Sequence, residues 1–173
     1  MQRFKNFGYY LALCYLLTGA LYAQAQNKTS LLGIDFAKGF ILQDTLFEKP
    51  FIDTDEWRNK PVRHRYIHGG FDDGTRFSFY FPEKKDYTGR FFQYITPFPD
   101  SETSAQAFPD EMSPIGFSIS HGAYFVETNE GGKIDFANPA SFRDPSIGAY
   151  RANAACAEIS RHIAKLIYNC DRP

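Results

Sequence analysis

The sequence predicts an α/β fold in which an antiparallel start leads into parallel strands joined by crossover helices. Three observations predict it. Two alternating apolar runs around Asp73-Gly74 indicate a β-hairpin within residues 62–81. Residues 123–128, "AYFVET", form a short, mostly apolar run that is typical of a strand covered on both faces. An amphipathic helix is expected after this run, and the two elements together begin a βαβ crossover.

The N-terminus has the pattern of a secretory signal peptide. Arg3 and Lys5 precede an apolar run at 9–22, and the small residues of "AQA" follow at 23–25. The apolar run is shorter than the roughly 20 residues needed to span a bilayer. We therefore expect residues 1–25 to be cleaved, no membrane anchor to remain, and the product to be secreted or periplasmic.

The rest of the chain divides into two parts. Residues 26–60 are mixed and mostly polar and are expected to form an N-terminal segment with one strand. Residues 61–173 contain most of the predicted elements, and the mature chain of roughly 150 residues is one domain on length alone. The 19 Lys and Arg residues nearly balance the 20 Asp and Glu residues, and no basic run stands out. Nucleic acid is therefore not expected as a partner.

Three strands are predicted in the first half of this domain. The first hairpin strand carries His64 and Tyr66 on one face, and the second alternates through the phenylalanines of "RFSFYF". Pro82 ends the second strand because it cannot donate to a β-ladder. The third strand, "GRFFQYITP", is stopped by its terminal proline.

Two helices are predicted around the run at 123–128. The first is short, with Ser113 as its N-cap and Pro114 in its first turn. The second begins after Asp144 as its cap and continues with apolar residues at helical spacing to residue 167. The predicted order after residue 61 is therefore β, β, β, α, β, α.

Three stretches are similar to segments of a known family: "FYFPEKKDYTGRFFQYITP", "SHGAYFVETNEGG" and "YRANAACAEISRHIAKLIYNCDRP". Their order and spacing resemble the N-terminal half of an α/β-hydrolase, and the closest branch is the tannase and feruloyl-esterase-like one. The resemblance covers residues 66–173. It implies an incomplete α/β-hydrolase-type sheet that ends before the nucleophile elbow.

The resemblance also implies a function. In that family a G-x-S-x-G elbow carries the serine nucleophile, with the acid and histidine after it, and this motif does not occur in the sequence. The expected nucleophile, acid and base would then lie beyond Pro173. The chain would be a truncated or partial ester-cleaving serine hydrolase, inactive alone, whose complete form acts on an ester-type small molecule without a cofactor. The alternative is a complete small secreted binding module, whose aromatic-rich sheet holds a carbohydrate or a protein.

Three residues are candidates for a site. By position in the resembled family, the backbone after the third strand contributes to the oxyanion hole, and Phe98 is the candidate because Pro97 has no N–H. Asn129 and Glu130 follow the strand at 123–128, at the edge where ligands bind in open α/β sheets. They are candidates for a substrate crevice, although the polar residues and glycines of "ETNEGGK" can also simply turn the chain.

The sequence predicts no metal site and leaves the cysteines open. His64 and His68 are four residues apart, but four residues of a strand span about 13 Å, too far for ligands about 2 Å from one metal. Cys156 and Cys170 lie on or just past one helix, where fourteen residues rise about 21 Å. A disulfide between them would need a sharp turn back, because bridged Cα atoms lie within about 7 Å. They are expected to be separate, or one of them pairs with a cysteine outside this chain.

Overall fold

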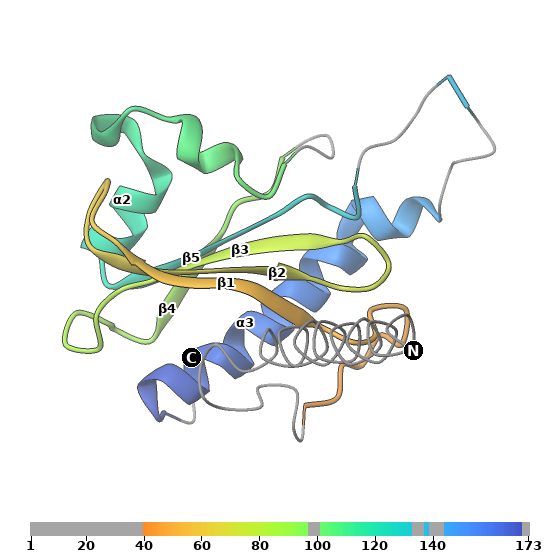
Figure 1. Ribbon diagram of the computed structural model, residues 1–173, viewed down its shortest axis with the longest axis horizontal. Coiled ribbons are helices and arrows are strands. Elements are labelled where there is room, and N and C mark those ends of the chain that lie inside the picture. Colours follow the sequence, from red (N-terminus) through yellow and green to blue (C-terminus); the bar gives the residue numbers. More distant parts are fainter. Residues whose placement is uncertain (1–39, 97–100, 133–136, 139–143, 171–173) are drawn as a thin grey trace, which may run out of the picture.

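The structure is a computed structural model that describes residues 40–96, 101–132, 137–138 and 144–170 of the 173. The predicted signal peptide and the candidate oxyanion residue Phe98 lie outside the described residues. Five strands form a single sheet in the order β1-β2-β3-β5-β4 (Figure 1). The strands are β1 (Phe51–Arg58), β2 (His64–Gly70), β3 (Arg76–Phe81), β4 (Arg90–Gln93) and β5 (Ala123–Thr128).

The pairing within the sheet is mostly antiparallel. Strands β1, β2, β3 and β5 pair antiparallel with their neighbours, and only β4 and β5 run parallel within the described sheet. The described residues contain two α-helices, α2 (Pro114–Ser120) and α3 (Ala152–Tyr168). Helix α2 lies between β4 and β5 in the chain, so it provides the crossover that a parallel pair requires.

The predicted fold class, an incomplete α/β-hydrolase-type sheet, is wrong. The described residues form a small β-rich domain with a mixed sheet, one parallel pair and two α-helices. Hydrophobic periodicity identified the elements, and the predicted order β, β, β, α, β, α is found as β2, β3, β4, α2, β5, α3. Periodicity does not specify strand direction, and β5 enters the sheet between β3 and β4, where it makes one antiparallel and one parallel pair.

Local sequence explains the ends of these elements. Ser113 caps α2 as predicted, because its Oγ accepts the N–H of Gly116 at 3.2 Å. Asp144 caps the segment that leads into α3, with its Oδ1 accepting the N–H of Ser146 at 2.9 Å. A π-helical turn at Ile147–Arg151 precedes α3 itself. At Gly69 a side chain is excluded, because a Cβ there would lie 2.0 Å from the carbonyl oxygen of Phe51 in β1.

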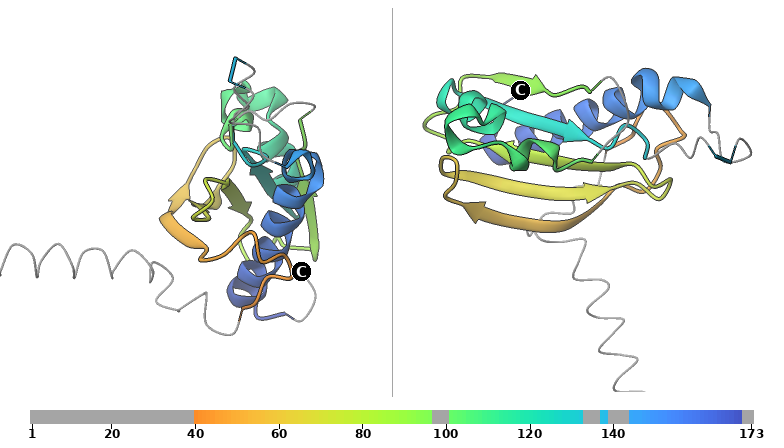
Figure 2. Two further views of the ribbon diagram at one scale, coloured as in Figure 1. Left: turned by 90° about the vertical axis from the view of Figure 1, so that its right-hand side faces the viewer. Right: turned by 90° about the horizontal axis from the view of Figure 1, so that it is seen from above.

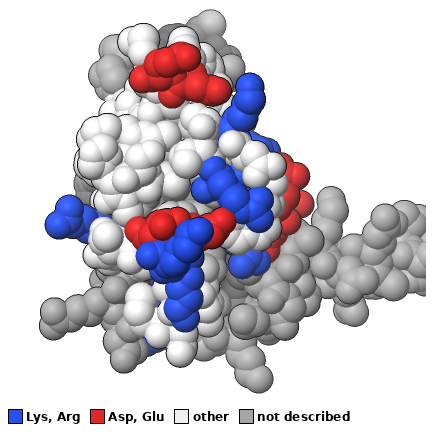
Figure 3. Space-filling model, turned by 90° about the vertical axis from the view of Figure 1, so that its left-hand side faces the viewer, with Lys and Arg blue, Asp and Glu red and all other residues white. Residues whose placement is uncertain are grey.

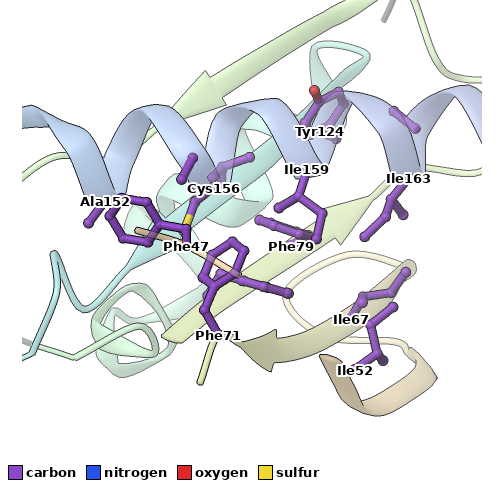
Figure 4. Close-up of a cluster of buried hydrophobic side chains, with 14 of the residues drawn as sticks. Phe47, Ile52, Ile67, Phe71, Phe79, Tyr124, Ala152, Cys156, Ile159 and Ile163 are labelled. Carbon is purple, nitrogen blue, oxygen red and sulfur yellow. The ribbon is translucent and has the colours of Figure 1, made fainter. Parts of the chain in front are cut away.

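One face of the sheet packs against α3 and is mainly apolar. Phe77, Phe79 and Phe81 of β3 alternate toward this face, as the sequence predicts, and all three are buried. Figure 4 shows side chains of α3, such as Cys156, Ile159 and Ile163, directed toward Phe79 and Ile67 of the sheet. Phe47 and Ile52 complete this cluster from the N-terminal segment. The α3 face is therefore the main core of the domain.

The opposite face is covered by α2 and by the segment before it. The right-hand view of Figure 2 shows α2 across the near face of the sheet and α3 behind it. A second and smaller apolar cluster lies here, where Ile115 and Ile119 of α2 contact Tyr66, Tyr80 and Phe125. Residues 101–113, which we call the cover segment, contain two short 3₁₀ turns and complete this layer. Buried polar groups occur on both faces, such as Asn153 and Ser160 on the α3 side, but the buried carboxyl group of Glu127 and the buried ring of His64 lie on the α2 face.

Candidate functional site

A buried carboxyl group lies at the centre of the α2 face. Glu127 of β5 is 1% exposed. Its Oε1 accepts the hydroxyl of Tyr80 at 2.6 Å, and its Oε2 accepts the N–H of Ala105 in the cover segment at 2.9 Å. The amide of Gln106 donates to the Tyr80 oxygen at 2.8 Å. A chain of hydrogen bonds therefore joins β5, β3 and the cover segment.

Alternation along β5 places Glu127 in this position. Tyr124 and Val126 belong to the cluster on the α3 face, whereas Phe125 belongs to the cluster on the α2 face. Glu127 follows Phe125 at the strand period of two and therefore points to the α2 side. Burial raises the pKa of Glu127 to about 7, although hydrogen bonds from Tyr80 and Ala105 act to lower it. The carboxyl group thus titrates near neutral pH.

His64 is the second polar group of this face. The residue is 1% exposed, and its ring centroid lies 5.5 Å from that of Tyr80. Its Nδ1 lies 2.7 Å from the carbonyl oxygen of Val62, so Nδ1 carries the proton because a carbonyl can only accept. Burial lowers the pKa of His64, which keeps the ring neutral at neutral pH. Its Nε2 is then a hydrogen-bond acceptor, and it has no partner among the described residues.

A pocket of about 180 Å³ is lined by His64 and by Tyr80 and Ala105, the two partners of Glu127. The sheet and the turn after β1 provide one wall, and the cover segment and the start of α2 provide the other. The lining residues are Arg58, Lys60, Pro61, His64, Tyr80, Ala105, Gln106, Phe108, Asp110, Ser113 and Ile115. Polar and basic groups therefore line much of this small space.

A larger hollow of about 610 Å³ lies on the outer side of the cover segment. It shares Pro61, Asp110 and Ser113 with the smaller pocket. Much of its lining consists of exposed side chains, such as Met112 at 71% and Phe117 at 55%. A buried polar group that lacks a partner occurs in the lining of the smaller pocket, and we therefore place the candidate site there.

His68 links the cover segment to β1 and β2. Its Nδ1 lies 2.5 Å from Asp53 Oδ1, and its Nε2 lies 3.2 Å from Glu102 Oε1. The hydrogen bond that His68 donates to Glu102 raises the pKa of His68, with Asp53 adding to the effect. In the described part of the chain, no group of three or more His, Cys, Asp or Glu side chains is placed to hold a metal ion.

Charged side chains surround the site without forming a patch of one sign. The guanidinium of Arg58 lies 3.4 Å from the centroid of the Tyr66 ring, and its Nη1 donates to the Gln106 side chain at 3.3 Å. Figure 3 shows one end of the molecule, where acidic and basic side chains are interspersed. Ion pairs such as Arg63 with Glu83, at 2.9 Å, form on the surface.

The predicted crevice residues have structural contacts. Asn129 accepts the N–H of Arg76 at 2.9 Å and donates to the carbonyl of Gly74 at 3.1 Å, which ties the β2–β3 hairpin to the end of β5. Glu130 has a positive φ of 53°, and its Oε1 accepts the N–H of Thr96 at 2.9 Å. Both are buried, at 8% and 3% exposure. Their role at a substrate crevice stays a prediction, and neither lines the pocket described above.

The two cysteines of the described part of the chain are not joined by a disulfide. Cys156 is buried in α3, and Cys170 lies just past its end. Burial raises the pKa of the Cys156 thiol, which keeps it in the protonated form. This arrangement agrees with the expectation that the two residues are separate.

The residues that line the pocket were not identified from sequence as site residues, and neither was Glu127, which bonds two of them, Tyr80 and Ala105. The available signal for Glu127 was a carboxyl group inside the otherwise apolar run "AYFVET", where every residue is buried. The signal for His64 was a histidine on the inward face of a predicted strand. Gln106 comes from a polar segment whose position over the sheet no local pattern specifies.

Comparisons with known protein families, with curated proteins and with solved structures found no significant match to this chain. The resemblance to α/β-hydrolases therefore stays a prediction. In the described ranges, no helix combines the length and the apolar character that crossing a membrane requires. The functional argument rests on the geometry of the pocket.

Proposed function

We propose that this chain is an exported binding module, and that its pocket holds a small ligand with hydroxyl groups, such as one sugar unit of a carbohydrate. The observation that carries the proposal is the buried Nε2 of His64. It is an acceptor without a partner among the described residues, and it belongs to a side chain that lines a pocket. A buried polar group that lacks a partner costs about 1–3 kcal/mol. A ligand O–H would remove this cost by donating to Nε2.

The other polar groups favour the same ligand class. Gln106 and Arg58 provide an amide and a guanidinium, and the buried Tyr80 provides an aromatic ring. Sites that bind small molecules combine apolar walls with a few placed polar groups. The volume of about 180 Å³ is below the roughly 300–1,000 Å³ of pockets for drug-sized ligands, so one small unit fits better than a long chain.

Export is part of the proposal because of the N-terminal pattern. Arg3 and Lys5 before an apolar run, with small residues at 23–25, are typical of a secretory signal peptide. An exported module would meet carbohydrates outside the cytoplasm. Detection of a mature N-terminus near Gln26 in culture supernatant or periplasm would test this part.

The binding test is titration of the mature chain with a panel of monosaccharides and short oligosaccharides, followed by NMR or calorimetry. We expect at least one member to bind, and His64→Phe to weaken its affinity by about tenfold or more, because Phe retains the ring but lacks the acceptor. His121→Phe is the matched control. Its Nδ1 also lies 2.7 Å from a backbone carbonyl, that of Phe117, but the residue is exposed.

A second variant keeps the test decisive if His64→Phe does not fold. Gln106→Ala removes a pocket amide from an exposed residue of the cover segment and is expected to leave the sheet intact. The proposal is wrong if no sugar binds the folded chain. It is also wrong if a sugar binds equally well to the wild type and to both pocket variants.

The ester-cleaving activity implied by the resemblance stays a prediction. It depended on a predicted sheet that the structure corrects, and neither the comparisons nor the contacts of the described residues test it. Release of a chromogenic acyl ester by the mature chain would test it directly. The geometry of the pocket supports binding better.

A further inference from the structure

The cover segment, residues 101–113, is attached to the sheet mainly by polar contacts. All of it is described, and within it only Ala105 and Ser113 are buried, whereas residues 106–112 are exposed. A segment that buries little apolar surface opens more easily than the sheet beneath it. Its closed position therefore depends on a small number of hydrogen bonds.

Besides Arg58, which donates to the Gln106 side chain at 3.3 Å, three side chains of the sheet hold the segment in place. The contacts are His68 Nε2 with Glu102 Oε1 at 3.2 Å, the N–H of Ala105 to Glu127 Oε2 at 2.9 Å, and the Gln106 amide to the Tyr80 hydroxyl at 2.8 Å. We propose that the cover segment is a pH-controlled lid over the pocket, closed in mildly acidic solution and increasingly open in mildly alkaline solution.

Glu127 favours closure when it is protonated. Under the closed cover its pKa is raised from 4.5 to about 7, mainly by burial. When the cover opens, water reaches the carboxyl group and its pKa falls toward the ordinary value. The closed state therefore binds the proton more tightly than the open state, and closure weakens as pH rises from about 4.5 to about 7.

His68 acts in the same direction. Its pKa is raised in the closed state, chiefly by the hydrogen bond with Glu102, so its stabilising contact is present at low pH and is lost as pH rises through that pKa. The same contact lowers the pKa of Glu102, whose contribution is lost only when pH falls below the ordinary carboxyl range. Closure is therefore strongest near the ordinary carboxyl range and weakens as pH rises toward neutrality.

The charged and titratable neighbours of these two groups come from every adjacent element. Glu127 is faced by Tyr80 of β3, Tyr66 of β2 and Glu102 of the cover segment, and the negative charge of Glu102 also raises its pKa. His68 is faced by Asp53 of β1 and by Glu102, and Arg76 of β3 favours the ionised form of Glu102. Glu127 and His68 thus both interact with Glu102, and their ionisation is coupled through it.

Opening of the lid would change the pocket directly. Five of the eleven lining residues belong to the cover segment: Ala105, Gln106, Phe108, Asp110 and Ser113. Displacing them would remove one wall and expose His64 to solvent. This consequence for ligand access rests on the proposed binding function, whereas the opening itself does not.

The test is amide hydrogen exchange of the mature chain without ligand, followed by NMR between pH 5.5 and 8. The Ala105 amide reports the lid because it donates to Glu127. After correction for intrinsic exchange rates, we expect its protection to fall by more than about tenfold over this range, while amides of β3 and α3 change little. Since no sugar is present, this result is independent of whether the pocket binds one.

Two variants distinguish the contribution of Glu127 from that of His68. Glu127→Gln cannot ionise, so the pH dependence of Ala105 protection should flatten. His68→Gln should lower protection at pH 5.5 and have little effect at pH 8. The lid proposal is wrong if the protection of the wild-type Ala105 amide stays constant from pH 5.5 to 8. It is also wrong if the pH dependence of this protection is unchanged when both variants are combined. Protection of β3 amides shows that each variant is folded.

Discussion

The two faces of the sheet use neighbouring residues of the same strands for different chemistry. On the α3 face, Phe79 is fully buried and stacks on Phe77 with ring centroids 4.3 Å apart. On the α2 face, the next residue, Tyr80, is equally buried, but its hydroxyl donates a hydrogen bond to the carboxyl group of Glu127. The α3 face is filled mainly by aromatic and aliphatic groups, and the α2 face contains a hydrogen-bonded chain that includes a carboxyl group and lies beside a pocket.

This difference assigns the two faces different roles, with the α3 face stabilising the fold and the α2 face carrying the candidate site. Burial of apolar surface is the main source of folding free energy, so the α3 face holds the domain together. A buried carboxyl group reduces stability, and so does the buried Nε2 of His64, which has no partner among the described residues. Their position beside a pocket suggests that the α2 face is organised for binding, and the following predictions test this contrast from the largest expected effect to the smallest.

Phe79→Ala should be the most damaging single change. Removing a fully buried aromatic ring from the α3 face leaves a cavity, and we expect the free energy of unfolding to fall by about 3–5 kcal/mol. Urea unfolding followed by circular dichroism measures the change. Phe92→Ala is the control, because this side chain is 48% exposed, and it should cost less than about 1 kcal/mol. Equal losses would mean that the α3 face is not the main core.

The ionisation of Glu127 should produce a pH dependence of global stability. Its folded pKa of about 7 exceeds the ordinary 4.5, so the folded state binds more protons between these values. The free energy of unfolding of the wild type, relative to Glu127→Gln, should therefore fall by up to about 3 kcal/mol as pH rises through this window. Urea titrations at several pH values measure it. If the stability of the wild type relative to Glu127→Gln rises with pH, the assigned sign is wrong. Glu111→Gln, at an exposed residue, serves as the control.

Removal of one hydroxyl should have different effects on the two faces. Tyr80→Phe removes the hydroxyl that donates to Glu127 Oε1 and accepts the Gln106 amide, and should cost about 1–3 kcal/mol. Tyr124→Phe on the α3 face should cost less than about 1 kcal/mol, because its contact with Ser160 is long, at 3.3 Å, and Ser160 also donates to Ala157. Chemical unfolding of both variants gives the comparison, and equal costs would count against a cooperative polar chain.

Ser113→Ala should have the smallest effect. It removes the N-cap of α2, whose Oγ accepts the N–H of Gly116, and should cost about 1 kcal/mol. Thermal unfolding measures this loss, with exposed Ser120→Ala at the other end of α2 as the control. A Ser113 variant as stable as the Ser120 variant would show that the cap does not position the helix over the pocket.

Local patterns predicted the elements of the fold, but they did not predict how the elements are arranged. The alternation in β3, the Ser113 cap and the amphipathic helix α3 depend on nearby residues, so the sequence indicated them correctly. Strand direction and the insertion of β5 between β3 and β4 depend on contacts between distant segments. For the same reason the sequence did not show that Glu127, His64 and Gln106 meet, since the cover segment folds back over the sheet.

The most direct test of the central claim, that the His64 pocket is a binding site, is NMR of the histidine ring nitrogens at pH 7.5 with and without the sugar panel. The account predicts a neutral His64 ring with the proton on Nδ1 and an Nε2 signal that shifts when a panel member binds, while His121 does not change. The account is contradicted if a sugar binds to saturation and the His64 Nε2 signal does not shift. It is also contradicted if both ring nitrogens of His64 carry protons at this pH.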